Sequence, residues 1–240
     1  HSPYMIQDDG ILRTIAALSH QHSLPVHMHV CEPQEEEKLS MQRHGKRSLQ
    51  RLADVGLLNE YLIAVHMTQA HQDDLDLFID SGASMVHCPA SNLKLASGFA
   101  AVQKLQQAGV NLAIGTDGAA SNNSIDMFQE LRLAALLAKG VSGDPTALNA
   151  RRALRMATLG SAKALHLDHC VGSLEPGKQA DIIAVDLSDI SMQPAHDPYV
   201  QLVYAMASAQ VSHVWVAGRP LVLQRKLQTL DMDVLRKKAA

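Results

Sequence analysis

The chain is poor in cysteine, in aromatic residues and in long apolar runs, and each shortage excludes a class of protein. Its 240 residues include only 3 cysteines, and 3% of its residues are aromatic. Three widely spaced cysteines without a Cys-x-x-Cys pair argue against a disulfide scaffold or a zinc–thiolate site. They favour a reducing, cytoplasmic setting. No apolar run reaches membrane-spanning length, so we expect no membrane partner.

The charge balance excludes a second class. The formal net charge is -3 and only 19% of the residues are charged, so no broad basic surface is expected. With few aromatic side chains to stack on bases, nucleic acid is not an expected partner. Hydrophobic residues make up 47% of the chain, which is enough for the large core of an α/β enzyme.

Short apolar runs alternate with helical patterns through the first part of the chain, which predicts a parallel sheet. Strands are expected at 26–30, 62–66, 83–87 and 111–114. Helices are expected at 8–23, 34–55 with a break at Gly45, 73–81, 100–108, 124–139, 146–157 and 161–165. The acidic run 35–37 is interpreted as a solvated helix start, where negative charge suits the helix dipole.

The pattern changes near residue 171. Residues 172–177 are rich in turn formers, 180–186 read as a strand, and 211–216 with 220–223 flank the turn 217–219 of a predicted hairpin. We therefore expect an α/β unit over residues 1–171 and a small antiparallel unit over residues 172–240.

Polar residues stand at the ends of the predicted parallel strands. His29 with Glu32, His66, His87 and Asp117 would meet at one edge of the sheet, where parallel α/β folds place their sites. Imidazoles and a carboxylate suit catalytic zinc, and Glu32 could move protons beside it.

Each of these residues also has a purely structural interpretation. A buried histidine can be satisfied by hydrogen bonds in the core, His87 can equally brace a loop, and Asp117 can cap the loop that follows it. Alternation places His27, His29 and Cys31 on one strand face, so either histidine could face a metal. The repeated occurrence of polar strand ends favours function.

Several motifs resemble the amidohydrolase superfamily. They are His29-x-x-Glu32, His66, the Gly-Thr-Asp at 115–117 and the Gly-x-Leu-x-Pro-Gly-Lys-x-Ala-Asp run at 172–181. Within it, residues 1–4, 91–98, 115–123 and 126–136 are similar to the 5-methylthioadenosine/S-adenosylhomocysteine deaminases. The resemblance implies an α/β fold with the later strand–helix units of a (β/α)8 TIM-type barrel, followed by part of a small β-sandwich.

The resemblance also implies a role for each matching residue. His29, preferred over His27 because Glu32 fixes the register, and Asp117 would bind one divalent metal, expected to be Zn²⁺. Glu32 would contact the purine and protonate its ring nitrogen, and His66 would hold or polarise the attacking hydroxide. His1 would touch the nucleoside. Asp117 would also contact substrate, passing a proton from water to the departing ammonia.

The implied reaction is metal-dependent hydrolytic deamination of an adenosine-type nucleoside, by a homo-oligomer. The alternatives are another amidohydrolase, acting on a guanine, pterin or triazine, and an inactive truncated barrel chain. The family's His-x-His pair on the first barrel strand is absent here. We therefore expect roughly three or more early strand–helix units, and the first sandwich strands, to lie outside this chain.

Overall fold

A four-stranded parallel sheet forms the first part of the chain. The computed structural model describes residues 2–239. The sheet has the order β1-β2-β3-β4, and its strands are β1 (Val26–Val30), β2 (Leu62–His66), β3 (Ser84–His87) and β4 (Leu112–Ile114). The four predicted strands and their parallel pairing are therefore confirmed.

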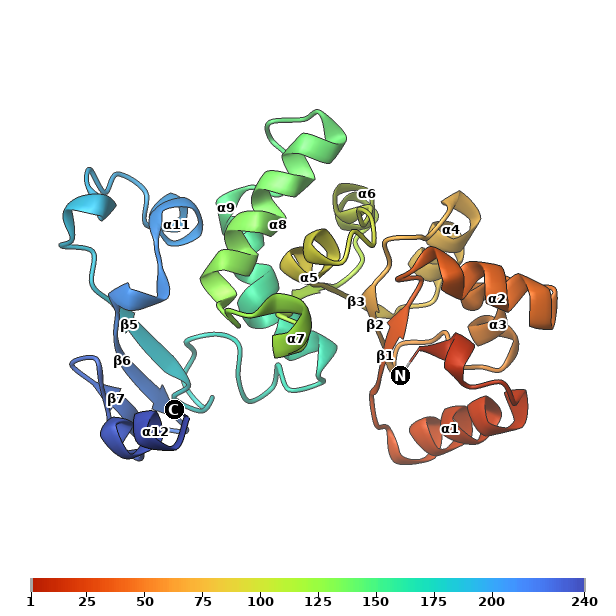
Figure 1. Cartoon of the computed structure of the whole chain (residues 1–240), viewed down its shortest axis with the longest axis horizontal. Coiled ribbons are helices and arrows are strands. Elements are labelled where there is room, and N and C mark those ends of the chain that lie inside the picture. Colours follow the sequence, from red (N-terminus) through yellow and green to blue (C-terminus); the bar gives the residue numbers. More distant parts are fainter. Residues whose placement is uncertain (1, 240) are drawn as a thin grey trace.

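Helices connect successive strands and form a layer beside the sheet (Figure 1). They are α1 (Asp9–His22), α2 (Gln34–His44), α3 (Ser48–Asp54), α4 (Gln72–Asp80), α5 (Pro89–Lys94) and α6 (Val102–Gln107). The expected break at Gly45 is confirmed, because this glycine ends α2 with a φ of 67° that other residues rarely adopt. The short helix α5 was not predicted from the sequence.

Further helices follow β4. They are α7 (Ala119–Asn122), α8 (Met127–Ser142), α9 (Ala150–Arg155) and α10 (Ser161–Ala164). The helix expected from 124 begins only at Met127, because the Asp126 side chain accepts hydrogen bonds from the backbone of the first turn. A π-helical turn, Met156–Gly160, joins α9 to α10, so two predicted helices form one continuous stretch.

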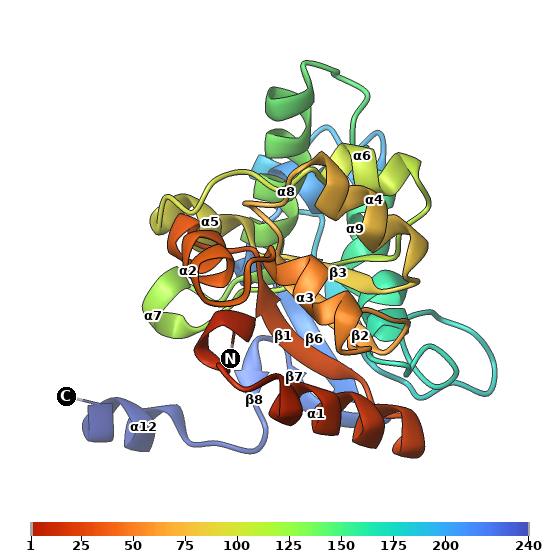
Figure 2. The same ribbon diagram turned by 90° about the vertical axis from the view of Figure 1, so that its right-hand side faces the viewer.

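The C-terminal part contains a second, antiparallel sheet. Its order is β5-β6-β7-β8, with β5 (Ile182–Val185), β6 (Val211–Val216), β7 (Arg219–Leu223) and β8 (Lys226–Leu227). The predicted hairpin is confirmed, and its turn residues Ala217 and Gly218 both have positive φ, as a tight hairpin requires. The same part of the sequence contains α11 (Pro198–Val200), which packs against α9, and α12 (Met232–Ala239), which projects from the sheet (Figure 2). Within residues 2–239 it is a single sheet, without a second sandwich layer.

Strands β2, β3 and β4 are buried on both faces, which explains their nearly continuous apolar sequences, whereas β1 alternates between buried and partly exposed residues. Met28, Leu62 and Met85 belong to the main core that packs against the helices. Ile63 and Val86, on the opposite face, form a smaller cluster that includes a residue of α10. Alternation along β2, β3 and β4 therefore supplies two separate apolar layers.

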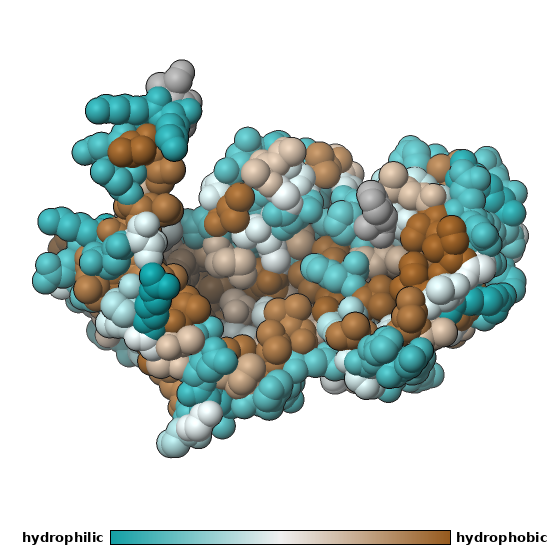
Figure 3. Space-filling view, turned by 90° about the horizontal axis from the view of Figure 1, so that it is seen from below, coloured by the Kyte–Doolittle hydropathy of each residue, from teal (hydrophilic) through white to brown (hydrophobic). Residues whose placement is uncertain are grey.

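The parallel sheet stays open within the described residues. Strands β1 and β4 are its two edges, so the closed eight-stranded barrel is not seen in this chain. Seen from below, the surface is hollowed along its middle, and apolar residues line part of the hollow (Figure 3). Among residues 2–239, no helix combines the length and apolar character needed to cross a membrane.

Candidate functional site

The chain bends sharply where the parallel strands finish, and these carboxyl ends lie together at one end of the sheet. Cys31 after β1, His66 at the end of β2 and Asp117 after β4 have φ values of 52°, 79° and 58°. Positive φ is costly for residues other than glycine, and it persists where the surrounding contacts hold it. These bends turn the chain out of each strand at the edge where sequence analysis placed the polar groups.

Three of the predicted site residues meet there. His29, Glu32 and His66 each offer one ligand atom, and these atoms lie within 4.8 Å of one another. The Nε2 atom of His66 is 3.8 Å from Oε2 of Glu32, and the rings of His29 and His66 meet edge to face with centroids 5.0 Å apart. His29 on β1 pairs with Val65, the residue before His66, so the two histidines lie on neighbouring strands near the same end of the sheet.

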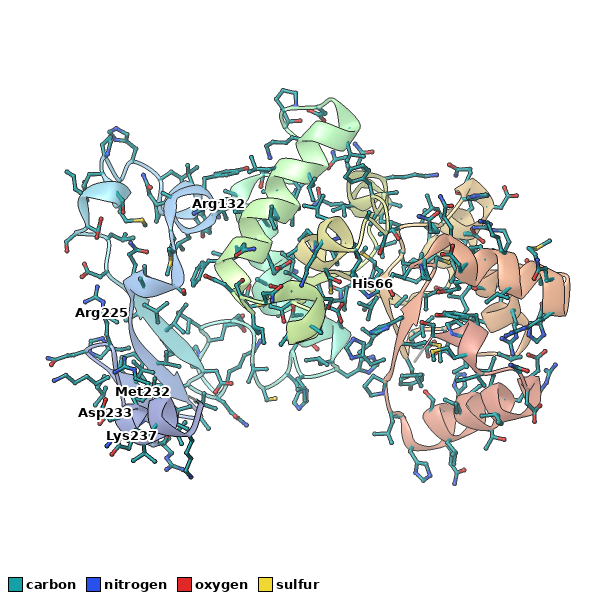
Figure 4. The ribbon with its side chains drawn as sticks, in the orientation of Figure 1. His66, Arg132, Arg225, Met232, Asp233 and Lys237 are labelled. Atoms are coloured by element: carbon teal, nitrogen blue, oxygen red, sulfur yellow. The ribbon has the colours of Figure 1, made fainter. Side chains whose placement is uncertain are left out.

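His66 is held in one orientation by a residue from α5. Its ring is fully buried, and Nδ1 donates a hydrogen bond to Oδ1 of Asn92 over 2.8 Å. In the neutral ring, this bond makes Nε2 the nitrogen that carries the lone pair, and Nε2 has no hydrogen-bond partner among the described residues. Figure 4 shows His66 at the middle of the molecule, near α5 and β1. A buried nitrogen without a partner, facing a carboxylate, suits a metal or an attacking water.

Asp117 is anchored by two serine hydroxyls. Its Oδ2 accepts hydrogen bonds from Ser91 Oγ (2.7 Å) and Ser121 Oγ (2.6 Å). Burial raises the pKa of Asp117, but hydrogen bonds from Ser121, Ser91 and the Gly118 amide, with the nearby His66, outweigh burial and bring it below its usual value. The carboxylate is therefore charged at neutral pH.

Asp117 lies outside the three-residue cluster, although it is close enough for its negative charge to affect the pKa of His29. Burial lowers the pKa of His29, and His66 lowers it further, while Glu32 and Asp117 act in the opposite direction. The pKa stays below its usual value, so His29 is neutral and its lone pair is free for a metal. Imidazole nitrogens and carboxylate oxygens are the donors that catalytic zinc prefers, so these residues fit a divalent metal.

The remaining expectations have different outcomes. His27 is exposed near the start of β1, while the Cys31 thiol lies with Glu36 and Glu37. The prediction that Cys31 shares a face with His29 is wrong, because its positive φ turns the chain away from the strand. His87 is buried and is not part of the cluster, and its Nδ1 has no hydrogen-bond partner among the described residues, so both interpretations of His87 stay open. His1 lies outside the described residues.

The sequence analysis missed residues that support the site. Ser91 and Asn92 lie in the run quoted for the family resemblance, but no pattern indicated that they would reach Asp117 and His66. The interpretation of 35–37 as a solvated helix start is wrong for Glu36 and Glu37, which are buried. Burial raises the pKa of Glu36 to about 7, although hydrogen bonds from backbone amides oppose it. A run of three acids gave no sign of which of them point inward.

Known proteins are similar in sequence to this chain over its whole length. A 5-methylthioadenosine/S-adenosylhomocysteine deaminase from Teredinibacter turnerae is 51% identical over 240 residues, which are 100% of this chain and 54% of that protein. A protein of the same name from Saccharophagus degradans is 45% identical over 239 residues, covering 100% of this chain and 53% of the other. The chain spans about half the length of these relatives.

Solved structures share the fold. An adenosine deaminase from Xanthomonas campestris with bound zinc superimposes with a TM-score of 0.94 at 50% identity, over 97% of this chain and 53% of that one. The zinc complex of an atrazine chlorohydrolase from Arthrobacter aurescens gives 0.89 at 28% identity, over 97% and 52%. These likenesses confirm the predicted resemblance. Residues 1–221 match the amidohydrolase family, and the chain belongs to that family.

Proposed function

We propose that the protein to which this chain contributes catalyses hydrolytic deamination of an adenosine-type nucleoside, releasing ammonia and the inosine analogue. The substrates would be 5-methylthioadenosine, S-adenosylhomocysteine or adenosine. The observation that carries the proposal is the buried Nε2 of His66, which has no hydrogen-bond partner among the described residues and lies 3.8 Å from the Glu32 carboxylate and beside His29. The names of the relatives in Teredinibacter turnerae and Xanthomonas campestris support the same reaction class.

His29 and Asp117 would hold a divalent metal, most simply zinc. When bound, this ion supplies the positive charge that lowers the pKa of a water toward neutrality. In the neutral ring, whose Nδ1–H bonds to Asn92, His66 accepts a hydrogen bond from the attacking water at Nε2. This orients the water toward the amino-bearing carbon of the purine.

Two carboxylates would manage the protons. Glu32, in its protonated form, donates to the purine ring nitrogen, so that the carbon under attack becomes more electrophilic. Asp117 takes a proton from the attacking water and delivers it to the amino group. The new carbon–oxygen bond forms, the carbon–nitrogen bond breaks, and ammonia leaves. The remaining hydroxyl proton is released as the carbonyl forms, and it restores the protonated form of Glu32. His1 is proposed to contact the nucleoside.

The architecture of the whole protein is part of the proposal. The open edges β1 and β4 are suited to pairing with further parallel strands, which would close a (β/α)8 barrel. The sheet β5–β8 likewise offers a face to a second sandwich layer. We divide the chain into a barrel portion over residues 1–171 and a sandwich portion over residues 172–240, and we place the protein in the cytoplasm as a homo-oligomer.

A second candidate is hydrolysis of another ring substrate by the same residues. The likeness to an atrazine chlorohydrolase supports this alternative, because that protein superimposes with a TM-score of 0.89. Guanine and pterin rings belong to the same group of alternatives. An inactive barrel chain is a third possibility, and metal content distinguishes it.

The test uses the full-length, zinc-loaded protein with methylthioadenosine and follows the ultraviolet change from adenine to hypoxanthine. We expect conversion by the wild type, no conversion by Asp117→Asn, and normal conversion by Asp144→Asn, whose carboxylate is exposed in a distant loop. Bound metal without conversion would favour another ring substrate, and absence of metal would favour the inactive chain. Turnover by Asp117→Asn would overturn the role of that residue.

A further inference from the structure

A fully buried glutamate of α2 reaches back to the end of β1. The two carboxylate oxygens of Glu36 accept hydrogen bonds from two consecutive backbone amides. Oε1 accepts from the amide of Cys31 over 2.8 Å, and Oε2 accepts from the amide of Glu32 over 3.3 Å. Glu36 therefore acts on the backbone that connects His29 to Glu32.

That backbone adopts a conformation that needs support. Cys31 has a φ of 52°, in the left-handed region that disfavours residues with a side chain. Successive amides in such a bend converge and create a small region of positive potential that binds an anion. The carboxyl group of Glu36 occupies this position, and its two oxygens accept from both amides, so it stabilises the bend that directs Glu32 into the site.

The carbonyl groups of the same two residues are held from the other side. The hydroxyl of Thr68 donates to the carbonyl oxygen of Glu32 over 2.8 Å, and the amide of Gln69 donates to that of Cys31 over 2.8 Å. All four backbone polar groups of Cys31 and Glu32 therefore have partners. The bend is clamped between α2 and the loop after β2, and the Glu32 carboxylate ends 3.8 Å from His66.

We propose that Glu36 is a positioning residue, which fixes Glu32 where it can exchange a proton with the substrate. The proposal rests on the function proposed above for Glu32. Glu36 bonds to backbone amides and lies outside the cluster of His29, Glu32 and His66, so its removal would act through the position of Glu32.

The neighbouring Glu37 provides a matched control. It is also buried and lies on the same helix, but it accepts from the amide of Ser48 over 3.3 Å and pairs with Arg47 over 3.4 Å. Among the described residues, none of its hydrogen bonds reaches the backbone of Cys31 or Glu32. Glu37 also lies beside the Cys31 thiol, but only Glu36 bonds to the backbone amides of the bend, so its replacement acts on the bend directly.

The first experiment compares steady-state kinetics of Glu36→Gln and Glu37→Gln in the full-length, zinc-loaded protein. Glutamine keeps the size of the side chain but turns an amide N–H toward a backbone N–H. We expect Glu36→Gln to lower kcat by about 10- to 100-fold. KM should change by less than about threefold, because ground-state binding is retained. Glu37→Gln should keep kcat near the wild-type value. Equal losses of kcat in both variants would overturn the proposal.

Two further measurements separate this proposal from others. Thr68→Val removes the donor to the Glu32 carbonyl with little change of shape, so it should lower kcat like Glu36→Gln and serves if that variant fails to fold. A crystal structure of Glu36→Gln, or of Thr68→Val in that case, should show the Glu32 carboxylate displaced from His66. This displacement is expected even if the wild type deaminates none of the nucleosides, which would defeat only the proposed function. An unmoved Glu32 would overturn the positioning role.

Discussion

The imidazole of His66 donates a hydrogen bond from Nδ1 to Oδ1 of Asn92 over 2.8 Å, and both side chains are buried. Asn92 belongs to α5, the helix that begins two residues after β3. Its neighbour Ser91 reaches Asp117 in the loop after β4. This short helix therefore connects two strand ends of the site, and it acts through two consecutive side chains.

Because Asn92 orients His66, we expect that replacing Asn92 lowers kcat although Asn92 is not proposed to contact the substrate. Asn92→Leu keeps a buried side chain of similar size but removes the acceptor that fixes the His66 tautomer. We expect kcat to fall by about 10- to 100-fold, because partners of this kind orient the groups that act. Steady-state kinetics at neutral pH would measure it.

Asn111→Ala is the control for that variant. Its side-chain amide donates to Ser84 and Gly160 at the opposite end of the sheet. We expect lower stability but an unchanged kcat. A wild-type kcat in Asn92→Leu would show that His66 keeps its tautomer without Asn92.

The parallel sheet could be predicted because the residue types of its buried strands are mostly apolar. Residues 62–66 and 84–87 are buried at every position, so they read as short apolar runs without alternation. The polar residue at the end of each run then indicated the edge of the sheet where a site would form. His29, Glu32 and His66 were predicted on that basis, and the structure brings them together.

The supporting contacts could not be predicted, because they join segments far apart in the sequence. Asn92 and His66 are 26 residues apart, and Glu130 accepts from the amide of Ala90 across 40 residues. Periodicity describes one element at a time, and it does not say which buried side chain meets which loop. The left-handed bend at Cys31 is similar, because nothing in the local sequence requires positive φ there.

Metal binding should distinguish two histidines on the same strand. His29 joins the cluster with Glu32 and His66, whereas His27 is exposed two residues earlier. We expect the full-length protein to bind about one zinc ion per chain, as catalytic sites of this donor type do. His29→Ala should lose most of this metal, and His27→Ala should keep it. Elemental analysis after dialysis measures the content, and equal retention by both variants would contradict the assignment of His29.

Glu130 should contribute to stability through a buried bridge. Its carboxylate accepts from the amide of Ala90 (3.1 Å) and from the side-chain amide of Asn122 (2.7 Å), and it is fully buried. Glu130→Gln turns a donor toward one of these donors, which should cost about 1–3 kcal/mol. Denaturant titration measures this loss. Glu35→Gln, at the exposed start of α2, should change stability by less than about 0.5 kcal/mol. Equal stability of the two variants would contradict the bridge.

His87 should make stability depend on pH. Burial, with a smaller contribution from His66, lowers its pKa from 6.5 to about 4. Between these values the unfolded chain binds a proton that the folded chain does not, so stability falls as pH falls from 6.5 toward 4. A shift of this size corresponds to about 3 kcal/mol. Glu36 acts in the opposite direction, because its pKa is raised to about 7 and protonation favours the folded form.

Comparison with His87→Gln isolates the histidine from the opposing contribution of Glu36. Both proteins retain Glu36, so its effect cancels when their stabilities are subtracted at each pH. We expect the stability of the wild type relative to His87→Gln to decrease steadily as the pH falls from 7 to 4. Thermal unfolding at a series of pH values measures this difference. Parallel curves for the two proteins would mean that His87 takes up its proton equally well in the folded chain, which is incompatible with an uncharged buried imidazole.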